Sequence, residues 1–425
     1  MIRETADSAA LTNNMSRKIY DAVIIGGGAS GLAAATELGL DAPSLDVLII
    51  EKNDSIGRKV RATGSGRCNI TNTGADGYNE IMAFFRRIGL VTREYPNGLV
   101  YPYSESAADV VSLFEERLAS LGTEILNGAQ VTEISKTDDL FCVKHEKKSD
   151  GITGEYEVYA RNVILAVGGK AGPTYGTVGD GYALARSLGH SIVTPVPVLT
   201  GIECAEWKPG AELSAMKLAG TRSRGKVSLY DGDKMTFEET GEIQFTKYGL
   251  SGICVFNMTR FMRYNRAAGE SLGKFTVNID LIPEGDIAEF LRDRAENDTG
   301  CAVRNILCTV LKENVAEYIL ERAESEEVNI SGNAGSLSEN DMEKLACIIH
   351  QLSFKPTSVR GWKDAQATSG GVSVDEVEYA TCESKLCRGL YITGELLDRD
   401  YPCGGYNLSN AWLTGIKAAG AIASR

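Results

Sequence analysis

Short apolar runs and segments of helical periodicity alternate along the first part of the chain. The apolar run 20–25 is followed by glycines and an alanine-rich stretch, 32–38, and the next apolar run covers 46–50. A short apolar run bounded by glycine predicts a buried strand, and the alanine-rich stretch predicts a helix packed against it. Strand, glycine turn, helix and strand in this order predict a Rossmann-like α/β domain with a parallel sheet.

Later segments extend this pattern. We expect strands over 123–134 and 163–166 and a short strand over 390–393 that leads to a helix running from 404 through 420. Asp180, between two glycines, is the predicted N-cap of a further helix.

The middle of the chain has a different pattern of hydrophobic and polar residues. Residues 191–282 contain short alternating runs separated by turns, which predict an antiparallel, barrel-like β subdomain, whereas 287–349 have helical periodicity. The predicted division is a disordered extension 1–16, the Rossmann-like domain 17–190 and 351–425, a β-rich substrate subdomain 191–285 and a helical subdomain 286–350.

Charge and composition limit the classes of function. The 425 residues have a net charge of -13, which argues against a nucleic-acid or membrane partner. The ten cysteines form no C-x-x-C pair and no segment is long and apolar enough to span a membrane, so we expect a cytoplasmic protein with reduced thiols. Three scattered histidines predict no metal site.

The first glycine turn has the spacing of a dinucleotide-binding motif. Gly26 permits the tight turn, Gly28 lets the backbone approach a pyrophosphate, and Gly31 allows close packing of helix on strand. Glu51 ends the second strand twenty residues later, where a carboxylate can accept hydrogen bonds from a ribose. The alternative is a doubly wound turn without a ligand.

The segment 57–72 favours FAD over NAD as the bound dinucleotide. It reads as a long loop rich in glycine, cations and amides, suited to lying along an extended cofactor, and the alternative is a solvated basic loop. The strands of 123–134 are then expected near the adenine end.

Four blocks carry a resemblance to a known family. They are IIGGGASGLAAA, TGSGRCNITN, LAVGGKAGPTYGTVGDGYALA and the stretch 367–420, which contains ATSGGV, TGELLD and GGYNLSNAW. The sequence resembles the BaiN-like or aminoacetone-oxidase family of bacterial flavoproteins, within the glutathione-reductase-type FAD fold. The resemblance implies FAD as cofactor, with the carboxylate of Glu395 on the ribityl chain and the helix that starts after Gly405 directed at the flavin.

The residue patterns and the resemblance together predict one set of FAD contacts. This set is Gly26, Gly28, Ala29, Ser30, Gly31, Glu51, Lys52, Arg58, Thr63, Gly64, Gly66, Arg67, Cys68, Asn69, Val131, Gly168, Gly169, Gly394, Glu395, Gly405, Tyr406 and Asn407.

The resemblance implies two activities that use flavin N5. One is NAD(P)H-linked reduction of a C=C bond in a small, steroid-like substrate, which we favour because Arg58, Lys59, Arg61 and Arg67 form a cationic region. The other is oxidation of a small amine such as aminoacetone. An FAD electron carrier without a substrate and a flavin-free NAD-dependent dehydrogenase remain rival classes. No second glycine motif is present, so a nicotinamide would bind only transiently, and the oligomeric state stays open.

The candidate catalytic residues are Tyr175, Arg360 and Cys403, which lie in or near the family-like blocks and are able to protonate or orient a substrate. Cys403 departs from the family pattern and reads either as a small apolar filler or as a thiol beside the flavin. Cys382 and Cys387 have the spacing of disulfide reductases but lie in the wrong part of the chain, so we interpret them as structural.

Overall fold

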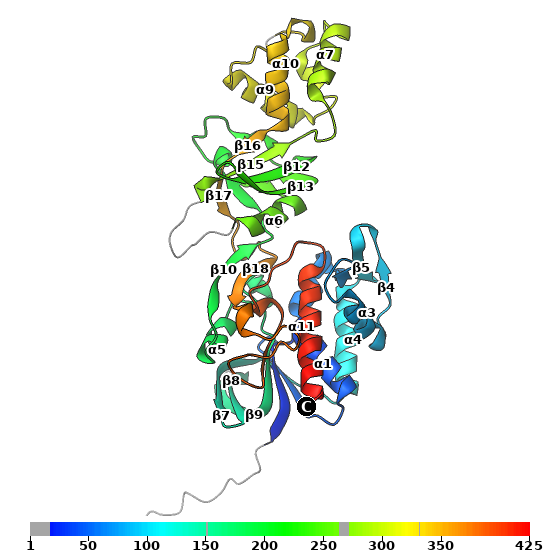
Figure 1. The fold of residues 1–425 in the computed structure, drawn as a ribbon, viewed down its shortest axis with the longest axis vertical. Helices are drawn as coiled ribbons and strands as arrows, with labels where there is room; N and C mark the ends of the chain where they lie inside the picture. Colours follow the sequence, from blue (N-terminus) through cyan, green and yellow to red (C-terminus); the bar gives the residue numbers. More distant parts are fainter. Residues whose placement is uncertain (1–17, 150–151, 263–271, 331) are drawn as a thin grey trace, which may run out of the picture.

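The structure is a computed structural model that describes residues 18–149, 152–262, 272–330 and 332–425. The predicted extension 1–16 lies outside the described residues. Figure 1 shows an elongated molecule with two bodies, here called the first unit and the second unit.

The first unit is built on a seven-stranded sheet with the order β6-β2-β1-β9-β8-β7, in which β19 also pairs with β9. Its strands are β1 (Ile19–Ile25), β2 (Val47–Glu51), β6 (Glu124–Asn127), β7 (Ala129–Thr137), β8 (Leu140–Ser149), β9 (Ile152–Leu165) and β19 (Leu390–Ile392). The pairs that join β6, β2, β1, β9 and β19 are parallel, and β7-β8-β9 is antiparallel. The predicted Rossmann-like α/β class is confirmed.

The register brings the carboxyl ends of four parallel strands to one edge of this sheet. Ile25 pairs with both Ile50 and Leu165, and Leu165 pairs with Ile392. All five residues of β2 are buried, as expected for a strand covered on both faces. Each of these strands therefore leads into its next loop at the same edge, which is where α/β folds bind ligands.

Helices cover one face of this sheet, as Figure 1 shows. They are α1 (Ala29–Asp41), α2 (Arg58–Ala62), α3 (Tyr78–Arg87), α4 (Ala107–Ser120) and α11 (Tyr406–Ala423). Trp412 of α11 lies among Phe85 and Phe114, with ring centroids 5.3 and 5.6 Å away. A Cβ on Gly415 would lie 2.2 Å from the Ser30 carbonyl oxygen, so this glycine lets α11 pack directly on α1.

Smaller elements complete the first unit. They are a three-stranded sheet of β3 (Thr71–Asn72), β4 (Thr92–Glu94) and β5 (Leu99–Pro102), the helix α5 (Gly181–Ser187), and the antiparallel pair β10 (Ile192–Val198) and β18 (Ala367–Val372). The pair β10 and β18 lies in Figure 1 at the end of the first unit that faces the second.

The second unit contains a seven-stranded antiparallel sheet with the order β16-β15-β12-β13-β14-β11-β17. Its strands are β11 (Ile202–Cys204), β12 (Arg222–Asp231), β13 (Lys234–Phe245), β14 (Gly249–Ser251), β15 (Phe275–Asp280), β16 (Leu352–Phe354) and β17 (Pro356–Val359). Its helices are α6 (Ile253–Met258), α7 (Ile287–Asn297), α8 (Val303–Leu307), α9 (Glu313–Ser325) and α10 (Glu339–His350). Sheet and helices share one apolar core.

Four details differ from the sequence predictions. Strand β10 pairs with β18 in the first unit, so 192–198 do not belong to the β-rich substrate subdomain predicted from 191 onward. Strands β16 and β17 pair with β15 and β11, so 352–359 belong to the second sheet and not to the cofactor domain predicted from 351 onward. Part of the predicted loop 57–72 is the helix α2, because Val60 is buried in the core. Asp180 precedes α5 but does not cap it, since its carboxylate forms an ion pair with Lys52 at 2.5 Å.

Candidate functional site

The first glycine turn is closely packed. Gly26 has φ +101°, and a Cβ there would lie 2.6 Å from the Ala166 carbonyl oxygen. A Cβ on Gly31 would lie 2.0 Å from the Gly26 carbonyl oxygen. Both glycines are therefore required by the fold itself, because the turn, the helix and β9 approach one another without room for side chains.

Gly28 is different, because the fold does not require a glycine at this position. Its backbone is extended (φ -81°, ψ -170°), and a Cβ would meet only the Ala166 carbonyl oxygen, at 4.0 Å. No side chain caps the N-terminus of α1 that follows. An open space in front of uncapped helix N–H groups suits an anionic group, so the residues present fit the pyrophosphate of a dinucleotide.

Glu51 lies beside this turn and is 7% exposed. Its Oε2 accepts a hydrogen bond from the Gly27 N–H at 2.7 Å, and its Oε1 accepts from the Asn53 N–H at 2.8 Å and from Asn53 Nδ2 at 2.6 Å. The predicted ribose-binding carboxylate is thus held rigidly next to the glycine turn.

A second polar group forms where β9 and β19 end. Glu395 Oε1 accepts from the Thr368 N–H at 2.7 Å, and Glu395 Oε2 accepts from Lys59 Nζ at 2.6 Å. A Cβ on Gly169 would lie 2.5 Å from Thr368 Oγ1, and one on Gly394 would lie 2.9 Å from Ser30 Oγ. The glycines predicted at the ends of these strands thus allow the segments to converge.

The loop that follows α2 reaches the N-terminus of α11. With the Asn69 amide turned so that its nitrogen and oxygen both find partners, its Oδ1 accepts a hydrogen bond from the Gly405 N–H at 3.1 Å. Asn72 Nδ2 donates to the Gly404 carbonyl oxygen at 3.1 Å. The Tyr406 hydroxyl donates to Asn72 Oδ1 at 3.1 Å. Two segments more than 300 residues apart in sequence are therefore in direct contact.

Helix α11 follows Gly405, which has φ +97° and offers no side-chain cap. The site thus combines two helix N-termini that follow glycines, those of α1 and α11, at one edge of a parallel sheet. This arrangement can hold one extended ligand that carries negative charge in two places.

The remaining predicted cofactor residues occupy the surroundings of this edge. Arg58 donates to Asn53 Oδ1 at 3.0 Å, and Arg67 lies over the Tyr101 ring at 4.8 Å. Cys68 is buried, and burial raises the pKa of its thiol to about 12. The others are Lys52 in its ion pair with Asp180, Thr63, Gly64 and Gly66 in the turn after α2, Val131 buried in β7, Gly168 with φ +73° after β9, and Asn407 in the first turn of α11.

Among the described residues, no hydrogen bond or ion pair joins the three catalytic candidates to one another. Tyr175 lies on a short 3-10 turn and is 39% exposed. Arg360 follows β17 and pairs with Glu203 and Asp364, both at 3.1 Å.

Cys403 lies in the loop before α11. Burial, reinforced by the charge of Glu239, raises the pKa of its thiol to about 12, which disfavours the thiolate. It packs against a small apolar cluster, as the filler interpretation expects.

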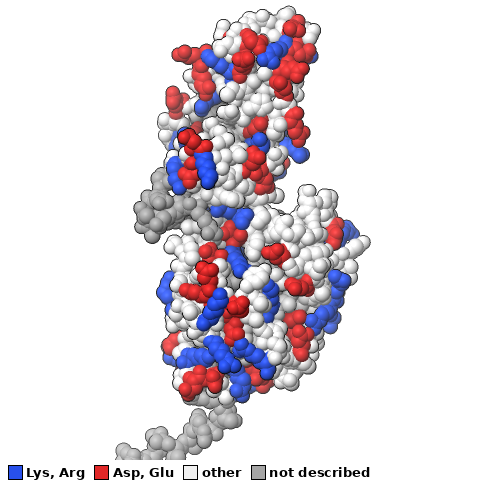
Figure 2. All heavy atoms as spheres, in the orientation of Figure 1, with Lys and Arg blue, Asp and Glu red and all other residues white. Residues whose placement is uncertain are grey.

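A hollow of about 360 Å³ lies where the turn after α6 meets the segment before α11. It is lined by Arg260, Phe261, Asp398, Arg399, Asp400 and Tyr401. Figure 2 shows acidic and basic side chains interspersed over the visible face of both units. Among the described residues no helix could cross a membrane, and no group of three or more His, Cys, Asp or Glu side chains could hold a metal ion.

Residues that sequence reasoning missed at this edge are Asn53 and Thr368, which hold the two carboxylates. Lys59 was recognised only as part of a cationic region, whereas its ammonium pairs with Glu395. Thr368 lies in the ATSGGV block, but nothing in that block indicates its partner.

Comparison with known proteins finds one matching family model and several similar proteins. The family described as HI0933-like protein Rossmann domain matches residues 20–78 and 76–421. The chain is 34% identical over 424 residues to 3-dehydro-bile acid delta(4,6)-reductase of Clostridium scindens, covering 95% of this chain and 98% of that protein. It is 24% identical to ribosomal RNA dihydrouridine synthase of Haemophilus influenzae, covering 93% and 97% of the two chains. The open conformation of a flavocytochrome c3 fumarate reductase aligns with a TM-score of 0.49 at 14% identity, covering 97% of this chain and 79% of that one.

Proposed function

The chain belongs to the HI0933-like family of Rossmann-fold, FAD-dependent oxidoreductases, which confirms the resemblance noted in the sequence, and from this premise we propose that it reduces a carbon–carbon double bond conjugated to a carbonyl group. The proposed substrate is a small steroid-like ketone, and the proposed electron donor is NADH or NADPH.

The observation that carries the proposal is the 34% identity to the bile-acid reductase over nearly the whole of both chains. The more distant relative is named as a dihydrouridine synthase. Both names describe saturation of a C=C bond, which in each case is conjugated to a carbonyl group. This shared chemistry favours a reductase over the amine oxidase that the sequence left open.

The chain's own residues would hold FAD along the sheet edge. The N–H groups of Ala29 and Ser30 would bind the pyrophosphate, Glu51 the ribose, and the N-terminus of α11 the flavin pyrimidine. The chemistry that bound FAD would supply is hydride transfer from the donor to one carbon of the substrate double bond, with a proton added to the neighbouring carbon. The positive end of α11 would stabilise negative charge on the flavin pyrimidine.

The test is an anaerobic titration of the purified yellow protein. We expect NADH or NADPH to bleach the flavin absorption, and a 3-oxo-4,6-diene bile acid to restore it with loss of the dienone absorption. Bleaching of the oxidised flavin by aminoacetone without a nicotinamide, followed by return of the absorption when oxygen is admitted, would favour the amine oxidase. Bleaching without reoxidation by any small molecule would favour an electron carrier.

A nucleic-acid substrate is the rival that the comparisons introduce, because two relatives are named as ribosomal RNA dihydrouridine synthases. The net charge of -13 disfavours binding to RNA phosphates, so the absence of a nucleic-acid partner stays our prediction. Reoxidation of the reduced flavin by unmodified ribosomal RNA, but not by the dienone, would overturn the proposal.

A further inference from the structure

The loop 400–403, which leads into α11, is held by side chains. Asn407 of α11 accepts from the Tyr401 N–H at 3.1 Å through Oδ1, and its Nδ2 donates to the carbonyl oxygens of Tyr401 at 2.8 Å and Pro402 at 3.4 Å. The path of this loop therefore depends on the groups that bind it.

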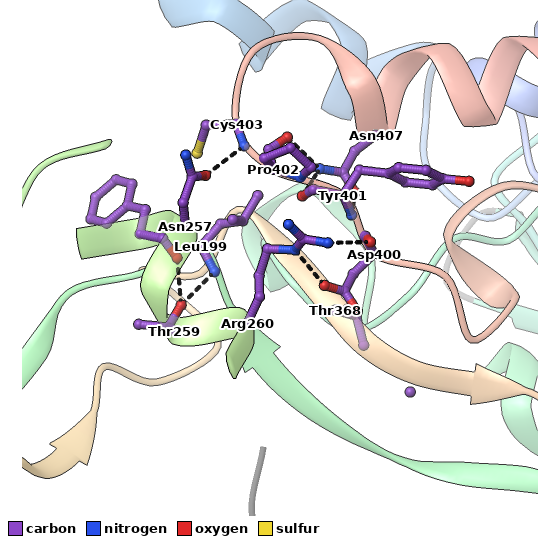
Figure 3. Close-up of polar contacts among 12 residues, drawn as sticks. Leu199, Asn257, Thr259, Arg260, Thr368, Asp400, Tyr401, Pro402, Cys403 and Asn407 are labelled. Carbon is purple, nitrogen blue, oxygen red and sulfur yellow. Dashed lines mark hydrogen bonds and ion pairs between the residues drawn. The ribbon is translucent and has the colours of Figure 1, made fainter. Parts of the chain in front are cut away.

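Two further groups come from the second unit, as Figure 3 shows. Asn257 of α6 is 6% exposed and accepts from the Cys403 N–H at 2.8 Å through Oδ1. Arg260 donates from Nε to Asp400 Oδ2 at 2.7 Å and from Nη2 to the Asp400 carbonyl oxygen at 2.9 Å. The Asp400 side chain is 4% exposed, so this ion pair is shielded from solvent.

Glu239 of β13 determines which way the Asn257 amide points. Asn257 Nδ2 donates to both carboxylate oxygens of Glu239, at 3.1 and 2.9 Å. A carboxylate only accepts hydrogen bonds, so the amide nitrogen must face Glu239 and the amide oxygen must face the Cys403 N–H. The chain Glu239, Asn257, Cys403 thus has a defined direction.

We propose that Asn257 and Arg260 are positioning residues, through which the second unit sets the loop 400–403 and hence the N-terminus of α11 beside the cofactor, with Glu239 fixing the orientation of Asn257. The effect on the cofactor rests on the proposed function, whereas the effect on the loop does not. The second unit would then influence the midpoint potential of the flavin without contacting it.

The reactivity of Cys403 reports on the loop directly. Cys403 is only partly exposed, whereas Cys347 on α10 is exposed and serves as an internal reference. Maleimide labelling of the FAD-containing protein, followed by peptide mass spectrometry, measures both rates. We expect Asn257→Ala and Glu239→Gln to raise the Cys403 rate relative to Cys347 by about tenfold, since each removes or misdirects one buried hydrogen bond.

An exchange of the two partners supplies the rescue. Asn257→Asp alone places two carboxylates side by side, and we expect it to loosen the loop. The double variant Glu239→Gln, Asn257→Asp restores one donor facing one carboxylate and keeps the Cys403 N–H accepted, so the labelling rate should return to within twofold of wild type. Asn314→Ala is the control, because Asn314 bonds only within the second unit, to Lys217 and Thr221.

The second readout is the midpoint potential of the bound FAD, measured by reductive titration with mediators. We expect it to shift in Asn257→Ala and to return in the double variant, with FAD occupancy unchanged. A Cys403 rate within twofold of wild type in both Asn257→Ala and Glu239→Gln would overturn the inference. An unchanged potential in a variant whose Cys403 has become reactive would overturn the link to the cofactor. Failure of the proposed function would be visible separately, in the wild-type protein, as reduced flavin that the dienone does not reoxidise.

Discussion

Replacing Gly28 by alanine should separate cofactor binding from folding. The extended backbone at Gly28 suits any residue, and the nearest atom to an added Cβ is 4.0 Å away. The apoprotein should therefore be as stable as wild type, or more stable by about 0.4–1 kcal/mol, because alanine reduces the freedom of the unfolded chain.

Binding of FAD should suffer, because the added methyl group would stand where the pyrophosphate approaches α1. The loss of charge-assisted hydrogen bonds costs about 1.5–3 kcal/mol each, so about 3 kcal/mol, or roughly 150-fold in Kd, is expected. Titration of the apoprotein with FAD, followed by quenching of flavin fluorescence, measures the affinity, and urea unfolding of the apoprotein measures its stability.

Two other glycines provide the controls. Gly420, for which an added Cβ meets nothing within 4 Å, should tolerate alanine with unchanged affinity. Alanine at Gly31 would place its Cβ 2.0 Å from the Gly26 carbonyl oxygen and should destabilise the fold. The reasoning is refuted when Gly28→Ala binds FAD within threefold of wild type.

Three further predictions concern single side chains. Glu51→Ala should weaken FAD retention by at least tenfold on dialysis, and unaltered occupancy would contradict the ribose assignment. Cys403→Ser should leave the rate of flavin reduction within a few fold in stopped-flow measurements, since its thiol, with a pKa raised to about 12, remains protonated; loss of reduction with FAD still bound would contradict the filler role. The pKa of Cys68 is also raised to about 12, so its contribution to stability is complete below the unfolded pKa near 9 and is lost as pH rises toward 12. Urea unfolding should show a loss of stability between pH 8 and pH 10 that is about 1.4 kcal/mol smaller in Cys68→Ala than in wild type.

Local pattern was enough to predict the parallel sheet and the parts of the cofactor edge. The run before Gly26, the strand that ends at Glu51 and the strand that ends before Gly394 all occur where expected. Each depends on neighbouring residues only, because buried strands must be apolar and tight turns must contain glycine. The order of these elements then places their carboxyl ends together through the geometry of parallel sheets.

Pairings between distant segments could not be predicted in this way. Lys59 and Glu395 are 336 positions apart, and Arg260 and Asp400 are 140 apart. Strands β16 and β17 were assigned to the wrong unit for the same reason, because the local sequence of a short strand does not indicate which sheet it joins. A charged or amide side chain can satisfy its hydrogen bonds with many partners, and only the packing of the complete chain selects among them.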